Sequence, residues 1–68
     1  MTDKPLQPHQ QRVVEETIQL DEKRVKLLEF TKGDIFSKLA ADEQERLMRQ
    51  LGLMDQYSQV LHERMEHF

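Results

Sequence analysis

Seven residues in the second half of the chain are spaced alternately four and three positions apart. They are Leu47, Leu51, Met54, Ser58, Leu61, Met65 and Phe68. In an α-helix, which turns once in about 3.6 residues, this spacing places all seven on one face. The pattern therefore predicts a long amphipathic helix that carries one polar residue, Ser58, on its apolar face.

The first half of the chain has a shorter version of the same pattern. Its members are Val14, Ile18, Asp21, Val25 and Leu28, and they are flanked by Val13, Leu20 and Leu27. No Gly or Pro occurs between His9 and Thr31, so we expect one helix over that range. Asp21 interrupts the apolar face, and a carboxylate there has to be paired, solvated or used. Two roles are open for it: a polar residue that sets the register of an interface, or a contact to a ligand.

The segment 32–34, Lys-Gly-Asp, is the first clear interruption of the helical pattern. Gly33 suits a left-handed residue at the end of the first helix. Asp34 can cap a short helical turn over 35–39. The two long helices are therefore predicted to be joined by a short connection.

A second long helix is expected to begin at residue 40 or 41 and to continue to about Glu66. Because the connection is short, the two helices should fold back antiparallel to one another. Facing residues should then have numbers that add to roughly 75, from the geometry of a helical hairpin. This register predicts the pairs Val25 with Leu51 and Ile18 with Tyr57 and Ser58.

With 68 residues, the chain is long enough for one small domain. Charged residues make up 34% of it, the net charge is −3, and it contains neither Cys nor an apolar run of membrane-spanning length. We therefore expect an intracellular protein with no disulfide, no thiolate zinc site and no membrane partner. The acidic balance argues against binding to duplex nucleic acid. Both prolines lie in residues 1–8, which we expect to be a flexible arm before a helical hairpin domain over 9–68.

Apolar residues cover more of each predicted helix than one partner helix can bury. Leu53, Tyr57 and Val60 form a second stripe beside the main face of the second helix. A lone hairpin of this length is marginally stable, because burial at ~25 cal/mol per Å² barely exceeds an ordering cost of ~1.5 kcal/mol per residue. We therefore expect an all-α, antiparallel two-helix hairpin that assembles with copies of itself into an oligomeric helix bundle, with a dimer as the simplest closure. The expected interface residues are Asp21, Leu51, Tyr57 and Leu61.

Few residues in the chain could carry catalysis. It has no Cys nucleophile and no glycine-rich phosphate loop, and the Ser and Thr hydroxyls have no evident base beside them. His62 with Glu66, and Glu63 with His67, have the spacing of metal-ligand pairs, but two ligands are weakly specific and suit a solvated helix end. We expect no enzyme activity, no cofactor and no metal site.

Basic residues gather locally in this acidic chain. The first helix contributes Lys23, Arg24, Lys26 and Lys32, and Arg46 and Arg49 lie at the same level of the predicted hairpin. Such a belt could hold a small phosphorylated ligand. It is also consistent with an ordinary charged face whose residues pair along each helix, such as Glu22 with Lys26 and Glu45 with Arg49. His9 and Arg12 add a second positive element near the start of the first helix.

Two stretches of the sequence form a recognisable pattern. The first is Pro8-His9-Gln10-Gln11-Arg12-Val13-Val14-Glu15-Glu16 with Leu20-Asp21-Glu22-Lys23. The second comprises Asp42-Glu43-Gln44-Glu45-Arg46-Leu47, Gln50-Leu51, Met54-Asp55-Gln56-Tyr57-Ser58-Gln59-Val60-Leu61 and Glu63-Arg64-Met65. In their order and spacing these stretches resemble small proteins of tailed phages and prophages, including crAss-like phages, over about residues 8–68. These proteins are in turn similar to the hairpin family of phage anti-CBASS and anti-Thoeris proteins.

This resemblance implies a homo-oligomer, from a dimer up to a hexamer, that sequesters a cyclic di- or trinucleotide immune signal in the cytoplasm of the bacterial host. In such sponges an aromatic side chain near the N-terminus stacks on a base, and a lysine of the first long helix contacts phosphate. His9 is the residue of this chain that could stack, and Arg12, Lys23 and Lys26 are the candidates for phosphate. The residues taken alone favour a different function, a helical-hairpin module that binds a host or phage protein through its apolar stripe. Both hypotheses predict binding rather than catalysis.

Overall fold

The computed structural model of the chain describes residues 5–68, and all regular secondary structure in this range is helical. Helix α1 spans Pro8–Thr31, the short helix α2 spans Asp34–Ser37, and helix α3 spans Ala41–Glu66. The prediction of an all-α chain with two long helices is confirmed. The predicted ends of the long helices, Thr31 and Glu66, are those observed.

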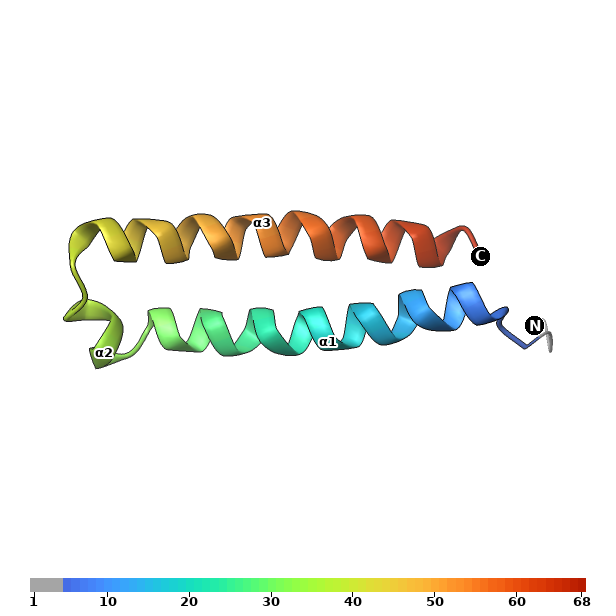
Figure 1. Ribbon diagram of the computed structural model, residues 1–68, viewed down its shortest axis with the longest axis horizontal. Helices are drawn as coiled ribbons and strands as arrows, with labels where there is room; N and C mark the ends of the chain where they lie inside the picture. The colour runs from blue at the N-terminus through green and yellow to red at the C-terminus, as the bar shows by residue number, and fades with distance from the viewer. Residues whose placement is uncertain (1–4) are drawn as a thin grey trace.

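The two long helices lie side by side, and α3 runs back along α1 after the turn that contains α2 (Figure 1). The molecule is a rod with extents of 50 × 18 × 16 Å. Of the predicted arm, residues 1–4 lie outside the described residues. Residues 5–7 precede α1, and Pro8 is already its first residue, as the fixed φ of proline allows in a first helical turn.

The connection between the long helices differs from its prediction in its backbone. Gly33 has φ −94° and ψ 172°, so it is extended rather than left-handed, and it precedes α2 as the N-cap residue. Lys32 ends α1 in a right-handed conformation, with its N–H donating to the Glu29 carbonyl, and the N–H of Gly33 donates to the Phe30 carbonyl. The prediction of a left-handed Gly33 is therefore wrong, because α2 follows α1 too closely for the chain to reverse at that residue.

The register of the hairpin is fixed by contacts between charged and polar side chains. Arg24 Nη1 lies 3.1 Å from Asp55 Oδ1, and Ser58 Oγ donates to Asp21 Oδ1 at 2.6 Å. In both pairs the residue numbers add to 79, so the predicted value near 75 is off by about one helical turn of ~3.6 residues.

The reason for the shifted register lies in the connection. Gln44 Nε2 donates to the carbonyls of Phe36 and Leu39 at 2.9 and 3.1 Å. These bonds hold the first turn of α3 over α2, beyond the end of α1, so that α3 reaches α1 later along its own sequence (Figure 1).

Helix α1 presents a different face to α3 than the sequence pattern predicts. Its buried residues are Val13, Thr17 and Leu20, whereas Ile18 is 54% exposed and Val25 is 46% exposed. The predicted inward face is therefore wrong by one residue, a rotation of about 100°. The observed orientation keeps the Asp21 carboxylate at the edge of the contact rather than at its centre, and Thr17 is buried because its hydroxyl donates to the Val13 carbonyl at 2.7 Å.

The face predicted for α3 is the one that packs on α1. Leu51, Ser58 and Leu61 are buried, and Leu47, Met54 and Met65 are half-buried. Phe68, the last member of the predicted pattern, is exposed. The apolar core consists of Val13, Leu20 and Leu61, with Met54 and Met65 packed against it.

Candidate functional site

The contact between α1 and α3 divides the exposed surface of the hairpin into two sides. Each step of one residue along a helix is a rotation of about 100°. A residue directly after a buried residue therefore lies on one side of the contact between the helices, and a residue directly before a buried residue lies on the other side. Asp21 follows Leu20, His62 follows Leu61, and the two are hydrogen-bonded across the helices. Residues that follow the buried face therefore share one side in both helices.

We name these surfaces after one residue of each. The His62 side comprises Ile18, Asp21 and Val25 of α1 with Met48, Gly52, Asp55 and His62 of α3. The Tyr57 side comprises Arg12 and Lys23 of α1 with Leu53, Tyr57, Val60 and Arg64 of α3.

A connected group of polar side chains occupies the His62 side near the contact between the helices. Asp21 accepts a hydrogen bond from Ser58 at 2.6 Å, and its other oxygen lies 3.0 Å from His62 Nε2. Arg24 Nε lies 3.5 Å from Asp21 Oδ1, and Arg24 Nη1 donates to Asp55. The negative charge of Asp21 is thus balanced within the chain, which answers why a carboxylate is tolerated at this position.

These contacts alter the acidity of Asp21. The hydrogen bond from Ser58, followed in importance by the one from His62, holds the pKa of the Asp21 carboxyl below its usual value, and the charge of Arg24 adds to this effect. Partial burial acts in the opposite direction and does not overcome the hydrogen bonds. Asp21 is therefore ionised at neutral pH and serves as an acceptor, not as a proton donor.

The outer part of the His62 side is apolar. Ile18, Val25 and Met48 are exposed. A shallow groove runs along α1 there, lined by Ile18, Asp21, Glu22, Val25 and Lys26. Gly52 adds no side chain on the neighbouring surface of α3, and a Cβ placed on it would meet nothing within 4 Å. Besides its apolar residues, the groove carries one exposed acidic and one exposed basic side chain, Glu22 and Lys26.

The Tyr57 side combines apolar and cationic side chains. Leu53, Tyr57 and Val60 are exposed along α3. Among residues 5–68, neither Arg12, Lys23 nor Arg64 forms an ion pair. From the register of the helices, Tyr57 lies level with Lys23. The side therefore presents an aromatic ring and a cation at the same level of the hairpin, on facing helices, an arrangement suited to a ligand with both a base and a phosphate.

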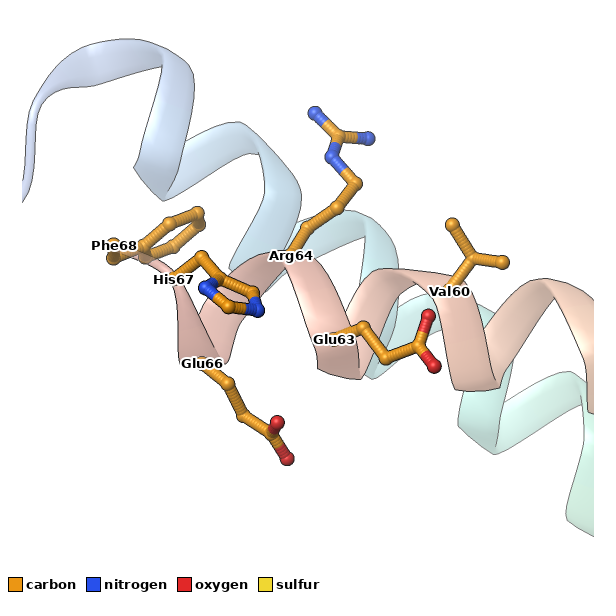
Figure 2. A pocket seen from close by; sticks show the side chains of 6 residues that line it. All are labelled: Val60, Glu63, Arg64, Glu66, His67 and Phe68. Carbon is orange, nitrogen blue, oxygen red and sulfur yellow. The ribbon is translucent and has the colours of Figure 1, made fainter.

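Near the end of α3 the surface has an open depression, lined by Val60, Glu63, Arg64, Glu66, His67 and Phe68. Figure 2 shows the side chains of Val60 and Arg64 projecting to one side of α3 and that of Glu66 projecting to the other. The depression holds two carboxylates, Glu63 and Glu66, beside one arginine, Arg64, so it is less suited to an anion than the surface of Arg12 and Lys23.

The residues predicted to contact a ligand are all exposed but are not gathered at one point. His9 lies in the first turn of α1, one turn before Arg12. Arg12 and Lys23 share the Tyr57 side but are separated by about 16 Å along the helix, at 1.5 Å per residue. Lys26 lies farther round α1, at the rim of the groove that contains Asp21 and Glu22.

The residues predicted at an oligomer interface divide into two groups. Leu51 and Leu61 are 7% and 1% exposed in the single chain, so the hairpin itself already covers them. Tyr57 is exposed, and Asp21 is half-buried within the polar group. The surfaces that remain uncovered are the outer stripes around Ile18 and Tyr57.

Sequence reasoning missed three members of these surfaces. Asp55 and Arg64 were given no role, and His62 was considered only with Glu66 as a metal pair. Their place follows from the register between the helices, which a pattern within one helix does not contain. The pairing of Asp21 with Arg24 is the contact of this group that the sequence alone indicates, because residues three apart on one helix are neighbours.

Two further properties concern the described part of the chain. No group of three or more His, Cys, Asp or Glu side chains within residues 5–68 is arranged to hold a metal ion. None of the helices α1–α3 has the length and apolar character needed to cross a membrane.

Comparison with known protein families finds a match to this hairpin. The model of the Sequestin family matches residues 7–67, which is nearly the whole hairpin. No curated protein and no solved structure matches the chain. The matched region includes α1, the connection and α3 up to its C-cap residue, so the likeness concerns the hairpin as a unit.

Proposed function

Because the chain belongs to the Sequestin family, whose name denotes sequestering of another molecule, we propose that it binds and sequesters a cyclic oligonucleotide immune signal. In this proposal it is a phage-encoded sponge that counters a bacterial defence of the CBASS or Thoeris type, in the cytoplasm of the host. It works as a homo-oligomer and does no chemistry on its ligand. The observation that carries the proposal is the family match over residues 7–67.

The charges of the Tyr57 side support a phosphorylated ligand. Lys23 is exposed and without an ion pair in the described chain, and Tyr57 lies level with it on α3. A cyclic dinucleotide carries two phosphates and two bases, so it needs cations and a stacking surface near each other. Lys23 would contact phosphate, and Tyr57 joins His9 as a candidate for stacking on a base.

The distance between the cations supports an oligomer as the binding form. Arg12 lies about 16 Å from Lys23 along the axis of α1, so the two do not meet around one phosphate within a chain. Arg12 of one copy would join Lys23 or Lys26 of another. Binding and self-association are therefore coupled in this proposal.

Calorimetric titration with a panel of cyclic di- and trinucleotides tests the proposal. We expect the wild type to bind at least one of them, and Lys23→Ala with Lys26→Ala to abolish binding while helicity is kept. Lys38→Ala, which removes an exposed cation on the connection, is the matched control and should bind as the wild type does. The nucleotide recovered from the denatured complex should be unchanged. Failure of the wild type to bind any member of the panel would contradict the proposal.

A second candidate function rests on the exposed apolar stripe of Leu53, Tyr57 and Val60. Exposed apolar surface of this kind also suits a partner protein, so the alternative is a hairpin module that binds a host or phage protein there. The two functions differ in their dependence on charge. Loss of binding on replacement of Lys23 and Lys26 favours the sponge, whereas the module depends on Leu53 and Val60.

A further inference from the structure

We infer that the His62 side of the hairpin is the surface covered by a second copy of this chain, through the same side of that copy, and that the Tyr57 side stays open for the ligand. This inference rests on the homo-oligomer of the proposed function and assigns the contact that forms without a ligand. The contact between Arg12 and Lys23 of different copies, which the proposed function invokes, would be a separate one on the Tyr57 side, bridged by the ligand itself. Two observations distinguish the sides: the state of their charges and the shape of their apolar parts.

The charged groups at the centre of the His62 side contact one another within one chain. Asp21 is held by Ser58, His62 and Arg24, and Arg24 also pairs with Asp55 at 3.1 Å. When such a surface meets an identical one, each of these groups already has a contact in its own chain, which lowers the cost of burying it. An isologous contact, in which both copies use the same surface, is therefore favourable here.

The Tyr57 side has the opposite property. Arg12, Lys23 and Arg64 form no ion pair within residues 5–68, although Glu16 lies on α1 between the first two. An isologous contact through this side would place these cations against those of the second copy, and like charges brought together are unfavourable. An anion is the occupant that this side suits.

The shape of the His62 side also fits a second hairpin. Ile18 and Val25 project beside a shallow groove on α1, and half of the surface of Met48 is exposed on α3. Gly52 lies in the same region with nothing within 4 Å of a Cβ position. A glycine inside a helix costs about 1 kcal/mol relative to alanine, and close approach of another helix is a reason for its presence.

The size of the chain supports a second copy as the occupant. Four apolar residues are buried within residues 5–68, the three of the core and Leu51, and this is little buried apolar surface for a 68-residue chain. Two hairpins stacked on their His62 sides form a four-helix bundle, which covers Ile18 and Val25 and encloses the polar group of Asp21.

Two matched substitutions test the assignment: Ile18→Lys on the His62 side and Leu53→Lys on the Tyr57 side. Both replace an exposed apolar residue, 54% and 60% exposed, with the same charged one. Sedimentation equilibrium at micromolar concentration gives the mass, and circular dichroism gives the helicity. We expect the wild type and Leu53→Lys to have at least twice the chain mass of 8.2 kDa, and Ile18→Lys to have a markedly lower mass than both.

Every other pattern of masses contradicts the inference. An unchanged mass for Ile18→Lys, dissociation of Leu53→Lys or a monomeric wild type each overturns it. If Ile18→Lys does not fold, the milder variant Ile18→Thr tests the inference instead. We expect its self-dissociation constant to be about tenfold or more above that of the wild type. An unchanged constant would contradict the inference. Nucleotide titration of the wild type is a separate measurement. Association through the His62 side without nucleotide binding would refute the sponge and leave this inference standing.

Discussion

The contact between α1 and α3 is apolar toward the chain ends and polar near its middle. Val13 and Leu61, with Met65 beside them, form the apolar part, while Asp21 and Ser58 belong to the polar part. Apolar contact stabilises roughly in proportion to the area buried and tolerates small slips. A hydrogen bond requires a particular distance and direction. The apolar part therefore supplies most of the stability, and the polar part selects one register.

The apolar part should show the largest effect of a single substitution. Leu61 is the most fully buried large side chain, at 1% exposure. Leu61→Ala should lower the free energy of unfolding by about 2–5 kcal/mol, since it removes buried methyl groups and leaves a cavity. Urea unfolding at fixed protein concentration measures this free energy. Val60→Ala, at the exposed neighbouring position, is the control and should change stability by about 0.5 kcal/mol or less. A loss below ~1 kcal/mol for Leu61→Ala would mean that the apolar part does not dominate.

The polar part should show a smaller loss of stability when it is broken. Asp21→Ala removes the acceptor of the Ser58 hydroxyl and the partner of His62 and Arg24. We expect a loss of about 1–3 kcal/mol, the cost of leaving buried polar groups without a partner. Glu22→Ala, the exposed neighbour, should be close to neutral. Equal effects of the two substitutions would contradict a role for the polar group.

How far the sequence predicts this molecule depends on which contacts decide each feature. The ends of the helices follow from local chemistry, and Thr31 and Glu66 were predicted correctly. The buried face of α3 was predicted correctly because the helix has one long run of apolar residues with four-and-three spacing. In α1 two apolar stripes lie side by side, and the choice between them depends on where Asp21 finds its partners on α3.

The candidate site shows the same limit. Exposed cations such as Arg12 and Lys23 are visible in the sequence. Their separation from the His62 side is not visible in the sequence, because it depends on the register between the helices, to which the polar contacts of Asp21 and Arg24 and the bonds of Gln44 to the connection contribute. A pattern within one helix carries no information on the level at which the other helix meets it.

Acid should weaken the polar part before the apolar part. The pKa of Asp21 is lowered in the folded chain, so the unfolded chain binds more protons in the range between that value and about 4. The stability contributed by Asp21 is therefore complete above pH ~4 and is lost as the pH falls through the lowered pKa. The charged and titratable groups in contact with Asp21 are Arg24 and His62, and Arg24 also pairs with Asp55.

Unfolding free energies of the wild type and Asp21→Asn between pH 2 and 7 measure this effect. The difference between them should shrink as the pH falls below about 4. Asp34→Asn, at the start of α2, serves as the control for general loss of carboxylate charge. A difference that stays constant over the whole range would show that ionisation of Asp21 does not stabilise the fold.

The smallest expected effect distinguishes the surface of the hairpin from its interior. Gly52 lies in α3 with open space around it in the single chain, so Gly52→Ala should raise the stability of a monomer by about 1 kcal/mol through helix propensity alone. If the His62 side is covered by a second copy, the added methyl group lies in that contact and should weaken association. The substitution is therefore made in two backgrounds, the wild type and the dissociated Ile18→Lys variant. Suppose that Gly52→Ala raises the stability of the Ile18→Lys variant and also raises the self-dissociation constant in the wild-type background. This result would place Gly52 in the interface. A gain in both, with association unchanged, would mean that no helix approaches Gly52 and that its glycine needs another explanation.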